Sequence, residues 1–244
     1  MFKLITPDFM NEAKNSPPLL EIKNLSCAYT HRKYGLFGKK EIKPVLDNIN
    51  MEIKPGEIFG LTGESGCGKS TLARCILGLI PCTGEIIFNG EKLEKIRGHE
   101  LRLTRSRLSQ MVFQESGASL NPVKNIGWLL EEPLIIHKLY NKEESKTKTD
   151  EILYHVGLDP SYKKRLPHEL SGGQKQRVCI GRSLLLSPKL LIADEAVNSL
   201  DVSESARILN LFTELNKNYG LSILFISHNK NAVEYLCDRI AEFS

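Results

Sequence analysis

The stretch Gly63-Glu64-Ser65-Gly66-Cys67-Gly68-Lys69-Ser70-Thr71 fits the pattern G-x-x-x-x-G-K-[ST], which holds the phosphates of a nucleotide. Its glycines let backbone amides approach phosphate oxygens without interference from a Cβ atom. We expect Lys69 to reach the β- and γ-phosphates and Ser70 to offer a hydroxyl to Mg²⁺. Residues 57–61 read as a short buried strand and residues 71–77 as a helix, so the phosphates would lie at a helix N-terminus. The sequence therefore predicts a nucleoside triphosphate site.

A second stretch, Leu170-Ser171-Gly172-Gly173-Gln174, contains a serine and a glutamine at the spacing of a capping box. Taken alone, such a box only starts a helix. Here the two glycines leave the first helical amides uncovered, so these amides could approach an anion. The stretch therefore indicates a second position at which backbone amides could bind a phosphate.

This second stretch resembles the signature of ABC-transporter ATPases, and other features follow in the order that this family uses. An apolar strand ends in two carboxylates, Asp194 and Glu195, and the strand 223–227 is followed by His228. By this resemblance Asp194 helps to hold Mg²⁺, Glu195 polarises the attacking water, and His228 contacts the γ-phosphate. Without the resemblance, a carboxylate or a histidine after a strand is more commonly an ordinary surface or core residue.

The same resemblance assigns the remaining members of the site. Tyr29 would stack on adenine, and Gln114, at the end of a strand, would contribute to the metal or its water. The expected catalytic residues are Glu195, His228, Lys69 and Gln114, and the expected Mg²⁺ ligands are Ser70, Gln114 and Asp194. The residues expected to bind ATP are Tyr29, Gly63, Glu64, Ser65, Gly66, Cys67, Gly68, Lys69, Ser70, Thr71, Ser171, Gly172, Gly173, Gln174 and Asp201.

The local sequence at residues 63–71, 110–122 and 167–174 resembles more specifically the ATPases of dipeptide, oligopeptide and nickel importers. The resemblance implies a second ABC ATPase subunit, identical or different, two membrane permeases, and indirectly an extracytoplasmic substrate-binding protein. ATP would close the pair of ATPase domains and hydrolysis would open it, at the cytoplasmic face of the cell membrane. Three departures stand out: Ala196 replaces the usual proline, Asn229 replaces the usual aspartate, and the chain stops at Ser244, where relatives begin a final strand pair and a tail. From that last departure we expect either a minimal or truncated member or a fold weakened by the missing edge.

The bulk properties exclude several other classes of protein. The chain has 244 residues and a formal charge of +4, from 33 basic and 29 acidic residues, without the clustering that a nucleic-acid interface needs. No apolar run reaches the length of a membrane span, and the N-terminus is broken by Pro7 and Asp8 before a signal-peptide core could form. Six cysteines lack the spacing of a zinc or iron–sulfur site, so reduced thiols are the simpler interpretation.

Alternation of strands and helices predicts an α/β fold, a P-loop ATPase core with a mostly parallel sheet and an N-terminal antiparallel β portion. Residues 1–18 read as a leader and residues 19–244 as the ATPase domain, with an inserted helical subdomain at about 116–187. The expected strands are 19–29, 47–53, 84–88, 109–114, 189–194 and 221–227, with an exposed basic hairpin tip or loop at 31–43 and a hairpin turn at Asn89-Gly90. The expected helices include one opened by Asn141 and Glu144, with a solvated face over 141–148, and one from Val202 to Lys217.

Two other functions stay open at this point. A soluble ABC ATPase of the translation or DNA-repair kind usually carries two ATPase domains or a long coiled-coil insertion, and neither is present in this sequence. A non-hydrolysing regulatory subunit would not need Lys69, Asp194, Glu195 and His228 together. In the importer interpretation, the apolar residues Trp128, Leu129, Leu134, Ile135 and Ile136 exceed what a small subdomain needs. We therefore expect the surface from about 115 to 140 to receive a permease helix, although each such side chain could equally pack the subdomain core.

Overall fold

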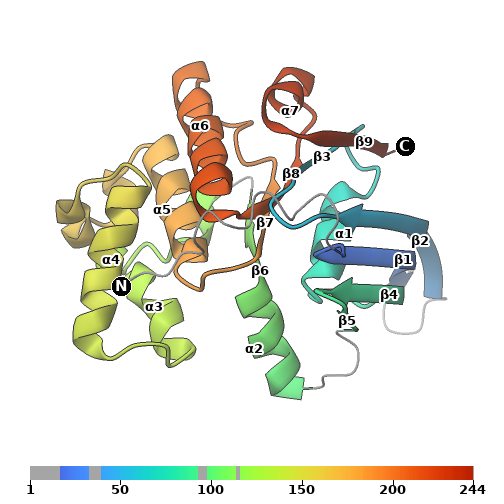
Figure 1. The fold of residues 1–244 in the computed structure, drawn as a ribbon, viewed down its shortest axis with the longest axis horizontal. Helices are drawn as coiled ribbons and strands as arrows, with labels where there is room; N and C mark the ends of the chain where they lie inside the picture. Colours follow the sequence, from blue (N-terminus) through green and yellow to red (C-terminus); the bar gives the residue numbers. More distant parts are fainter. Residues whose placement is uncertain (1–16, 33–39, 93–97, 114–115, 244) are drawn as a thin grey trace.

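The computed structural model describes residues 17–32, 40–92, 98–113 and 116–243. A central parallel sheet lies between an antiparallel sheet and a block of helices (Figure 1). The strands are β1 (Leu20–Arg32), β2 (Lys40–Ile53), β3 (Ile58–Gly63), β4 (Thr83–Phe88), β5 (Glu91–Lys92), β6 (Ser109–Val112), β7 (Leu190–Asp194), β8 (Ser222–Ile226) and β9 (Arg239–Phe243). The helices are α1 (Lys69–Ile76), α2 (Gly98–Leu108), α3 (Ile126–Ile136), α4 (Lys142–His155), α5 (Gly172–Leu184), α6 (Val202–Tyr219) and α7 (Lys230–Leu236), with short 3-10 helices η3 (Ser116–Ser119), η4 (Pro160–Lys164) and η5 (Pro167–Glu169).

The parallel sheet has the strand order β6-β7-β8-β3-β9, and every neighbouring pair runs in the same direction. Strands β7 and β8 are buried along their whole length, as expected for the centre of a parallel sheet covered on both faces. Because parallel strands end at the same edge, the residues that follow β3, β7 and β8 meet there. This edge is where ligands usually bind in such sheets.

Each central strand contributes side chains to two separate cores. Along β7, Leu190 and Ile192 belong to the core shared with α1 and the antiparallel sheet. Leu191 and Ala193 belong instead to the core shared with the helical block and α6. This alternation follows the period of two residues in a strand, so the two faces of the sheet pack against different cores.

The antiparallel sheet has the order β2-β1-β4-β5 among the described residues. The hairpin predicted at Asn89-Gly90 is confirmed, since β4 and β5 pair on either side of it and both residues have positive φ. The hairpin expected around 31–43 is confirmed, because β1 pairs antiparallel with β2 as far as Arg32 and Lys40, so both strands extend into the range expected for its tip. A basic composition is compatible with an edge strand, and it does not stop main-chain pairing. Residues 33–39 lie outside the described residues.

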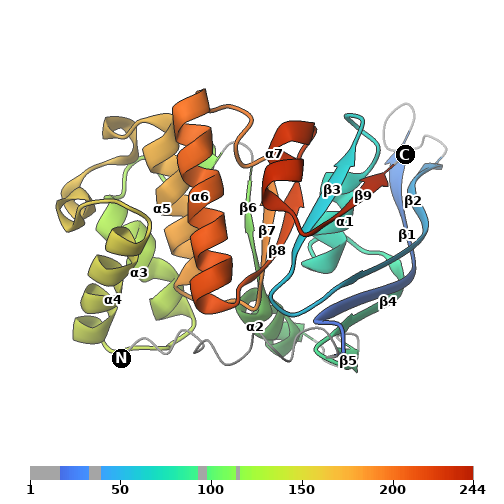
Figure 2. The same cartoon turned by 45° about the horizontal axis from the view of Figure 1, so that its top comes forward.

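The described elements between Ser116 and Leu184 are all helical. The capping box predicted at the start of α4 is confirmed, with Asn141 accepting from the amide of Glu144 and Glu144 accepting in return. The face over 141–148 is mostly exposed, but Lys148 is buried and pairs with Glu151 at 2.7 Å, so the expected solvated face is wrong there. Figure 2 shows α3, α4 and α5 grouped on one side of the sheet.

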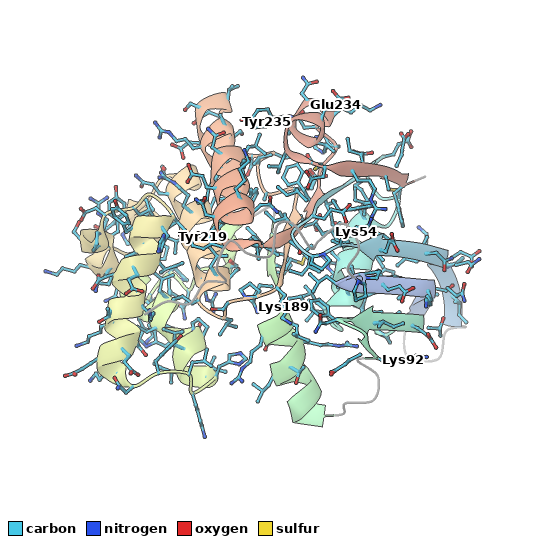
Figure 3. All side chains as sticks on the ribbon, in the orientation of Figure 1. Lys54, Lys92, Lys189, Tyr219, Glu234 and Tyr235 are labelled. Carbon is cyan, nitrogen blue, oxygen red and sulfur yellow. The ribbon has the colours of Figure 1, made fainter. Side chains whose placement is uncertain are left out.

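Tyr219 ties this helical block to the sheet domain. Its hydroxyl, at the end of α6, lies 3.1 Å from Nδ1 of His155 at the end of α4 (Figure 3). Burial, with a smaller contribution from Glu214, raises the pKa of Tyr219, so the phenol stays protonated at this junction. A protonated hydroxyl can donate to the imidazole and hold α4 against α6.

The helices α2 and α7 and the strand β9 were not predicted. The sequence of α2 is largely basic and polar, and it lacks the apolar stripe by which helices are recognised. Strand β9 is short and mostly exposed, and its backbone pairs with β3, a partner far away in the sequence. Strand β6 also stops at Val112 and not at residue 114. The overall architecture predicted from the sequence is confirmed, and no helix in the described ranges is long and apolar enough to cross a bilayer.

Candidate active site

The loop from Gly63 to Gly68 connects β3 to α1, as the sequence predicted. Gly68, the N-cap of α1, has φ of 110°, and a Cβ atom there would lie 2.8 Å from Leu46. Gly63 has φ of 144°, and its Cβ would lie 2.2 Å from the carbonyl oxygen of Phe243 on β9. Both positions therefore need glycine, because a side chain would be strained and would also collide with the neighbouring strands.

Lys69 lies inside this loop and is only 6% exposed. Its ammonium group donates to the carbonyl oxygens of Gly63 and Glu64, each at 2.8 Å, and lies 3.6 Å from the sulfur of Cys67. The two carbonyl groups carry no net charge, so they do not neutralise the positive charge of Lys69. The loop therefore offers an anion a buried charge beside a helix N-terminus.

Asp194, the last residue of β7, faces the start of α1. The Ser70 side chain hydrogen-bonds to its carboxylate, while Oδ1 is buried and has no hydrogen-bond partner. Burial raises the pKa of Asp194, and the Ser70 hydrogen bond together with Lys69 and Arg74 opposes that rise. A buried carboxylate oxygen without a partner, beside a hydroxyl, fits a divalent cation such as Mg²⁺, which prefers oxygen ligands.

Glu195 and His228 meet at the same sheet edge, after β7 and β8. Glu195 oxygens lie 3.1 and 3.2 Å from Nδ1 of His228. Asn198 lies between them, with its side-chain nitrogen donating to Glu195 and 2.9 Å from the same imidazole nitrogen. The sequence analysis missed Asn198. Its position three residues after Glu195, with a residue type that is common in turns, was the available signal.

The second stretch begins α5 as a capping box, which confirms that part of the prediction. Ser171 accepts from the amide of Gln174, whose side-chain oxygen accepts from the amide of Ser171, and Gln174 also reaches the Tyr162 hydroxyl at 3.1 Å. Gly173 is buried because Glu204 of α6 packs against it, so a Cβ there would lie 2.1 Å from a Glu204 oxygen. The stretch is thereby fixed against α6.

Four other residues were singled out in the sequence, and their positions in the structure differ in what they support. Tyr29 on β1 is half-buried, and its hydroxyl lies 3.5 Å from Thr71 in α1. Asp201 caps α6 by accepting from the amide of Glu204, and Asn229 caps α7. Gln114 lies outside the described residues. The structure thus brings Lys69, Ser70, Asp194, Glu195 and His228 to one edge of the sheet, while both views place β6, β7 and β8 between α1 and α5 (Figures 1 and 2).

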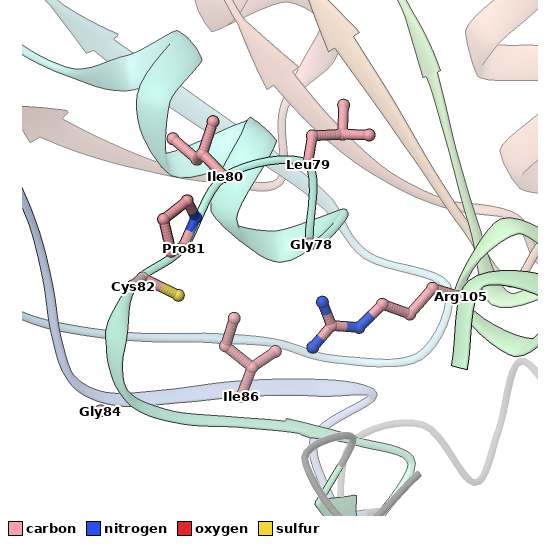
Figure 4. A pocket seen from close by; sticks show the side chains of 8 residues that line it. All are labelled: Gly78, Leu79, Ile80, Pro81, Cys82, Gly84, Ile86 and Arg105. Atoms are coloured by element: carbon pink, nitrogen blue, oxygen red, sulfur yellow. The ribbon is translucent and has the colours of Figure 1, made fainter. Parts of the chain in front are cut away.

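A hollow of about 400 Å³ lies at the far end of α1, away from this edge (Figure 4). It is lined by Gly78, Leu79, Ile80, Pro81, Cys82, Gly84, Ile86 and Arg105 and holds no expected site residue. Nearby, a hydrogen bond to Cys82, together with burial, raises the pKa of the Cys75 thiol. The Cys75 thiol is therefore neutral, and no group of three potential metal-binding side chains occurs in the part of the chain that the structure describes.

Known proteins resemble this chain in sequence. Residues 46–198 match the family model described as ABC transporter. The chain is 42% identical over 231 residues to the oligopeptide transport ATP-binding protein AppF of Bacillus subtilis (strain 168), covering 93% of this chain and 70% of that protein. It is 40% identical to the glutathione import ATP-binding protein GsiA of Pectobacterium atrosepticum, covering 93% of this chain but only 36% of that protein.

Two solved structures have a similar fold. A dimeric post-hydrolysis state of the ATP-binding cassette MJ0796, bound to ADP and Pi, superposes with a TM-score of 0.80 at 31% identity, over 92% of this chain and 94% of that one. The cbiO1 protein of Clostridium perfringens, part of the ABC transporter complex cbiONQ, superposes with a TM-score of 0.79 at 26% identity, over 94% and 86%.

Proposed function

Because the matched family model spans more than half of the chain, this protein belongs to the ABC transporter ATP-binding family, and we propose that it powers peptide uptake through a membrane importer. The chain is an ATPase subunit of that family, as its resemblance to the peptide importers predicted. Its relatives are named for oligopeptide and glutathione transport, which supports a peptide as cargo. Nickel, the other cargo considered from the sequence, has no such support among these relatives.

The observation that carries the proposal is the group of side chains around the end of β7. Lys69 brings a buried positive charge to the phosphate loop, and Ser70 and Asp194 face each other with an unpartnered carboxylate oxygen. We infer that Ser70 and Asp194 hold Mg²⁺, with Gln114 as a further contributor. When bound, Mg²⁺ neutralises the charge of the phosphates. The protein's own part is to hold and orient the triphosphate.

Glu195 follows Asp194 directly and is the carboxylate that we assign to the attacking water. It would orient that water and accept its proton as the γ-phosphate is cleaved. His228, 65% exposed and next to Glu195, would contact the γ-phosphate. Tyr29, beside Thr71, would stack on the adenine ring. These roles are proposals, supported by the shared edge at which the groups meet.

A complete site needs a second ATPase domain in this proposal. Ser171, Gly172 and Gly173 lie at the start of α5, and strands β6, β7 and β8 lie between that helix and α1 of the same chain. We infer that they close over ATP held by a partner, and that Asp201 faces the same junction. The test compares ATP hydrolysis by the purified chain at low concentration with hydrolysis after adding its partner ATPase and permeases. We expect a marked rise in turnover, while full activity in a strictly monomeric sample would contradict the shared site.

The permease would dock on the helical block at the cytoplasmic face of the membrane. Of the residues singled out in the sequence, Leu129 and Leu134 are core, whereas Trp128 is 39% exposed and Ile135 and Ile136 are each 61% exposed. Ile135→Glu and Ile136→Glu should therefore leave folding intact and weaken co-purification with the permeases. Tyr154→Glu, an exposed aromatic on α4, is the matched control. Unchanged association of both isoleucine variants would place the docking surface elsewhere.

A further inference from the structure

Asn198 contacts both groups that the proposed function assigns to hydrolysis. Its amide nitrogen donates a hydrogen bond to Glu195 Oε2 and lies 2.9 Å from Nδ1 of His228. The two Glu195 oxygens approach the same Nδ1 at 3.1 and 3.2 Å. Asn198 is therefore the common neighbour of the carboxylate and the imidazole.

The orientation of the Asn198 amide is set from its other end. The hydroxyl of Ser227 donates to Asn198 Oδ1 at 3.3 Å, and the Ser227 oxygen accepts from the amide of Asn229 at 3.1 Å. Ser227 has no exposed surface. Because Oδ1 is taken by Ser227, the NH₂ group faces Glu195 and His228. A flipped amide would instead turn an oxygen toward the carboxylate.

The backbone holds the two side chains in the same turn. Glu195 has φ of 53°, in the left-handed region that is costly for any residue except glycine. Its amide donates to the carbonyl of Ile226 on β8 at 2.9 Å, and the amide of Asn198 donates to the Glu195 carbonyl at 3.3 Å. A strained backbone kept at a candidate catalytic carboxylate is better explained by the direction it gives the side chain than by the turn alone.

We propose that Asn198 is a positioning residue, which holds the Glu195 carboxylate for the attacking water. Its amide NH₂ donates to Glu195 Oε2, and because a carboxylate oxygen can only accept, this contact sets the direction of the carboxylate. This inference rests on the proposed function, because it acts through Glu195.

The first test is Asn198→Asp, which keeps the shape of the side chain and replaces its donor by an acceptor. We expect kcat for ATP hydrolysis by the full chain to fall about 10- to 100-fold, with KM and ATP affinity within about twofold of the parent. Asn210→Asp is the control, because it makes the same change on an exposed asparagine of α6 that accepts from Tyr235 at 3.0 Å. Parental kcat in Asn198→Asp, or an equal loss in Asn210→Asp, would overturn the proposal.

A double variant separates this inference from the proposed function. If Asn198 acts through Glu195, adding Asn198→Asp to Glu195→Gln causes no further loss of hydrolysis. A further tenfold loss would overturn the positioning role while leaving Glu195 as the catalytic carboxylate. Parental hydrolysis in Glu195→Gln alone would overturn the proposed function itself, and the positioning role with it.

Discussion

Gly173→Ala tests how closely α5 and α6 approach at the start of the signature helix. The added Cβ would lie 2.1 Å from Glu204 Oε2 and 2.8 Å from its Cγ, so the Glu204 side chain must move. Glu204 is only 14% exposed and pairs with Arg177 at 3.6 Å and with Arg207 at 2.6 Å. Overpacking of this kind costs about 1–3 kcal/mol, and alanine in a helix recovers up to about 1 kcal/mol relative to glycine.

The expected net loss for Gly173→Ala is about 1–2 kcal/mol, or about 2–8 °C in Tm for a chain of this size. Thermal and urea unfolding of the chain without nucleotide measure it. Gly172→Ala is the matched control, because its Cβ would meet only Leu200 at 3.5 Å, an ordinary contact, and we expect it to be neutral or slightly stabilising. In a Glu204→Ala background, Gly173→Ala should no longer destabilise. An equal loss in both backgrounds, or no loss in the parent, would refute the steric argument.

The remaining predictions concern two titrating groups and their pH dependence. Burial, and secondarily Arg107, lowers the pKa of His137 below its usual 6.5. As pH drops below about 6.5, the unfolded chain therefore binds a proton at this histidine more readily than the folded chain, and the free energy of unfolding should fall. His137→Gln should flatten that fall in urea unfolding curves, and an unchanged slope would argue against it. Burial raises the pKa of Asp194 in the folded chain. The ionised carboxylate therefore destabilises the metal-free chain once the pH rises above the pKa that Asp194 has in the unfolded chain. Asp194→Asn should raise Tm at pH 7 by about 2–4 °C for each kcal/mol of desolvation cost that it removes, and it should abolish hydrolysis. A lower Tm would contradict the assignment of Asp194 as a buried charge that destabilises the metal-free chain.

The sequence was sufficient for those parts of the site that depend on local chemistry. The glycines around Lys69, the capping box at Ser171 and the buried strand before Asp194 each follow from residue type and spacing over a few positions. The order of these motifs along the chain then implied the parallel sheet, since strands that alternate with helices must end at one edge.

What could not be predicted depends on contacts between distant segments. Strand β9 is specified by its pairing with β3, and the close approach of Glu204 to Gly173 depends on how α6 packs against α5. The role inferred for Asn198 needs β7 and β8 side by side, because only then does Ser227 reach its amide. The pairing of β1 with β2 likewise extends beyond the strands that the local sequence indicated.

In the proposed function, one sheet edge binds a triphosphate and Glu195 at that edge directs its hydrolysis. The most direct measurement is the rate of ATP hydrolysis by Glu195→Gln at saturating Mg²⁺ and ATP, with ATP binding measured on the same sample and Lys69→Ala alongside. We predict that Glu195→Gln binds ATP like the parent, hydrolyses it slower by about two orders of magnitude or more, and accumulates as an ATP-bound dimer with its partner, while Lys69→Ala loses binding. Parental hydrolysis by Glu195→Gln, together with loss of activity in Lys69→Ala, would contradict this proposal.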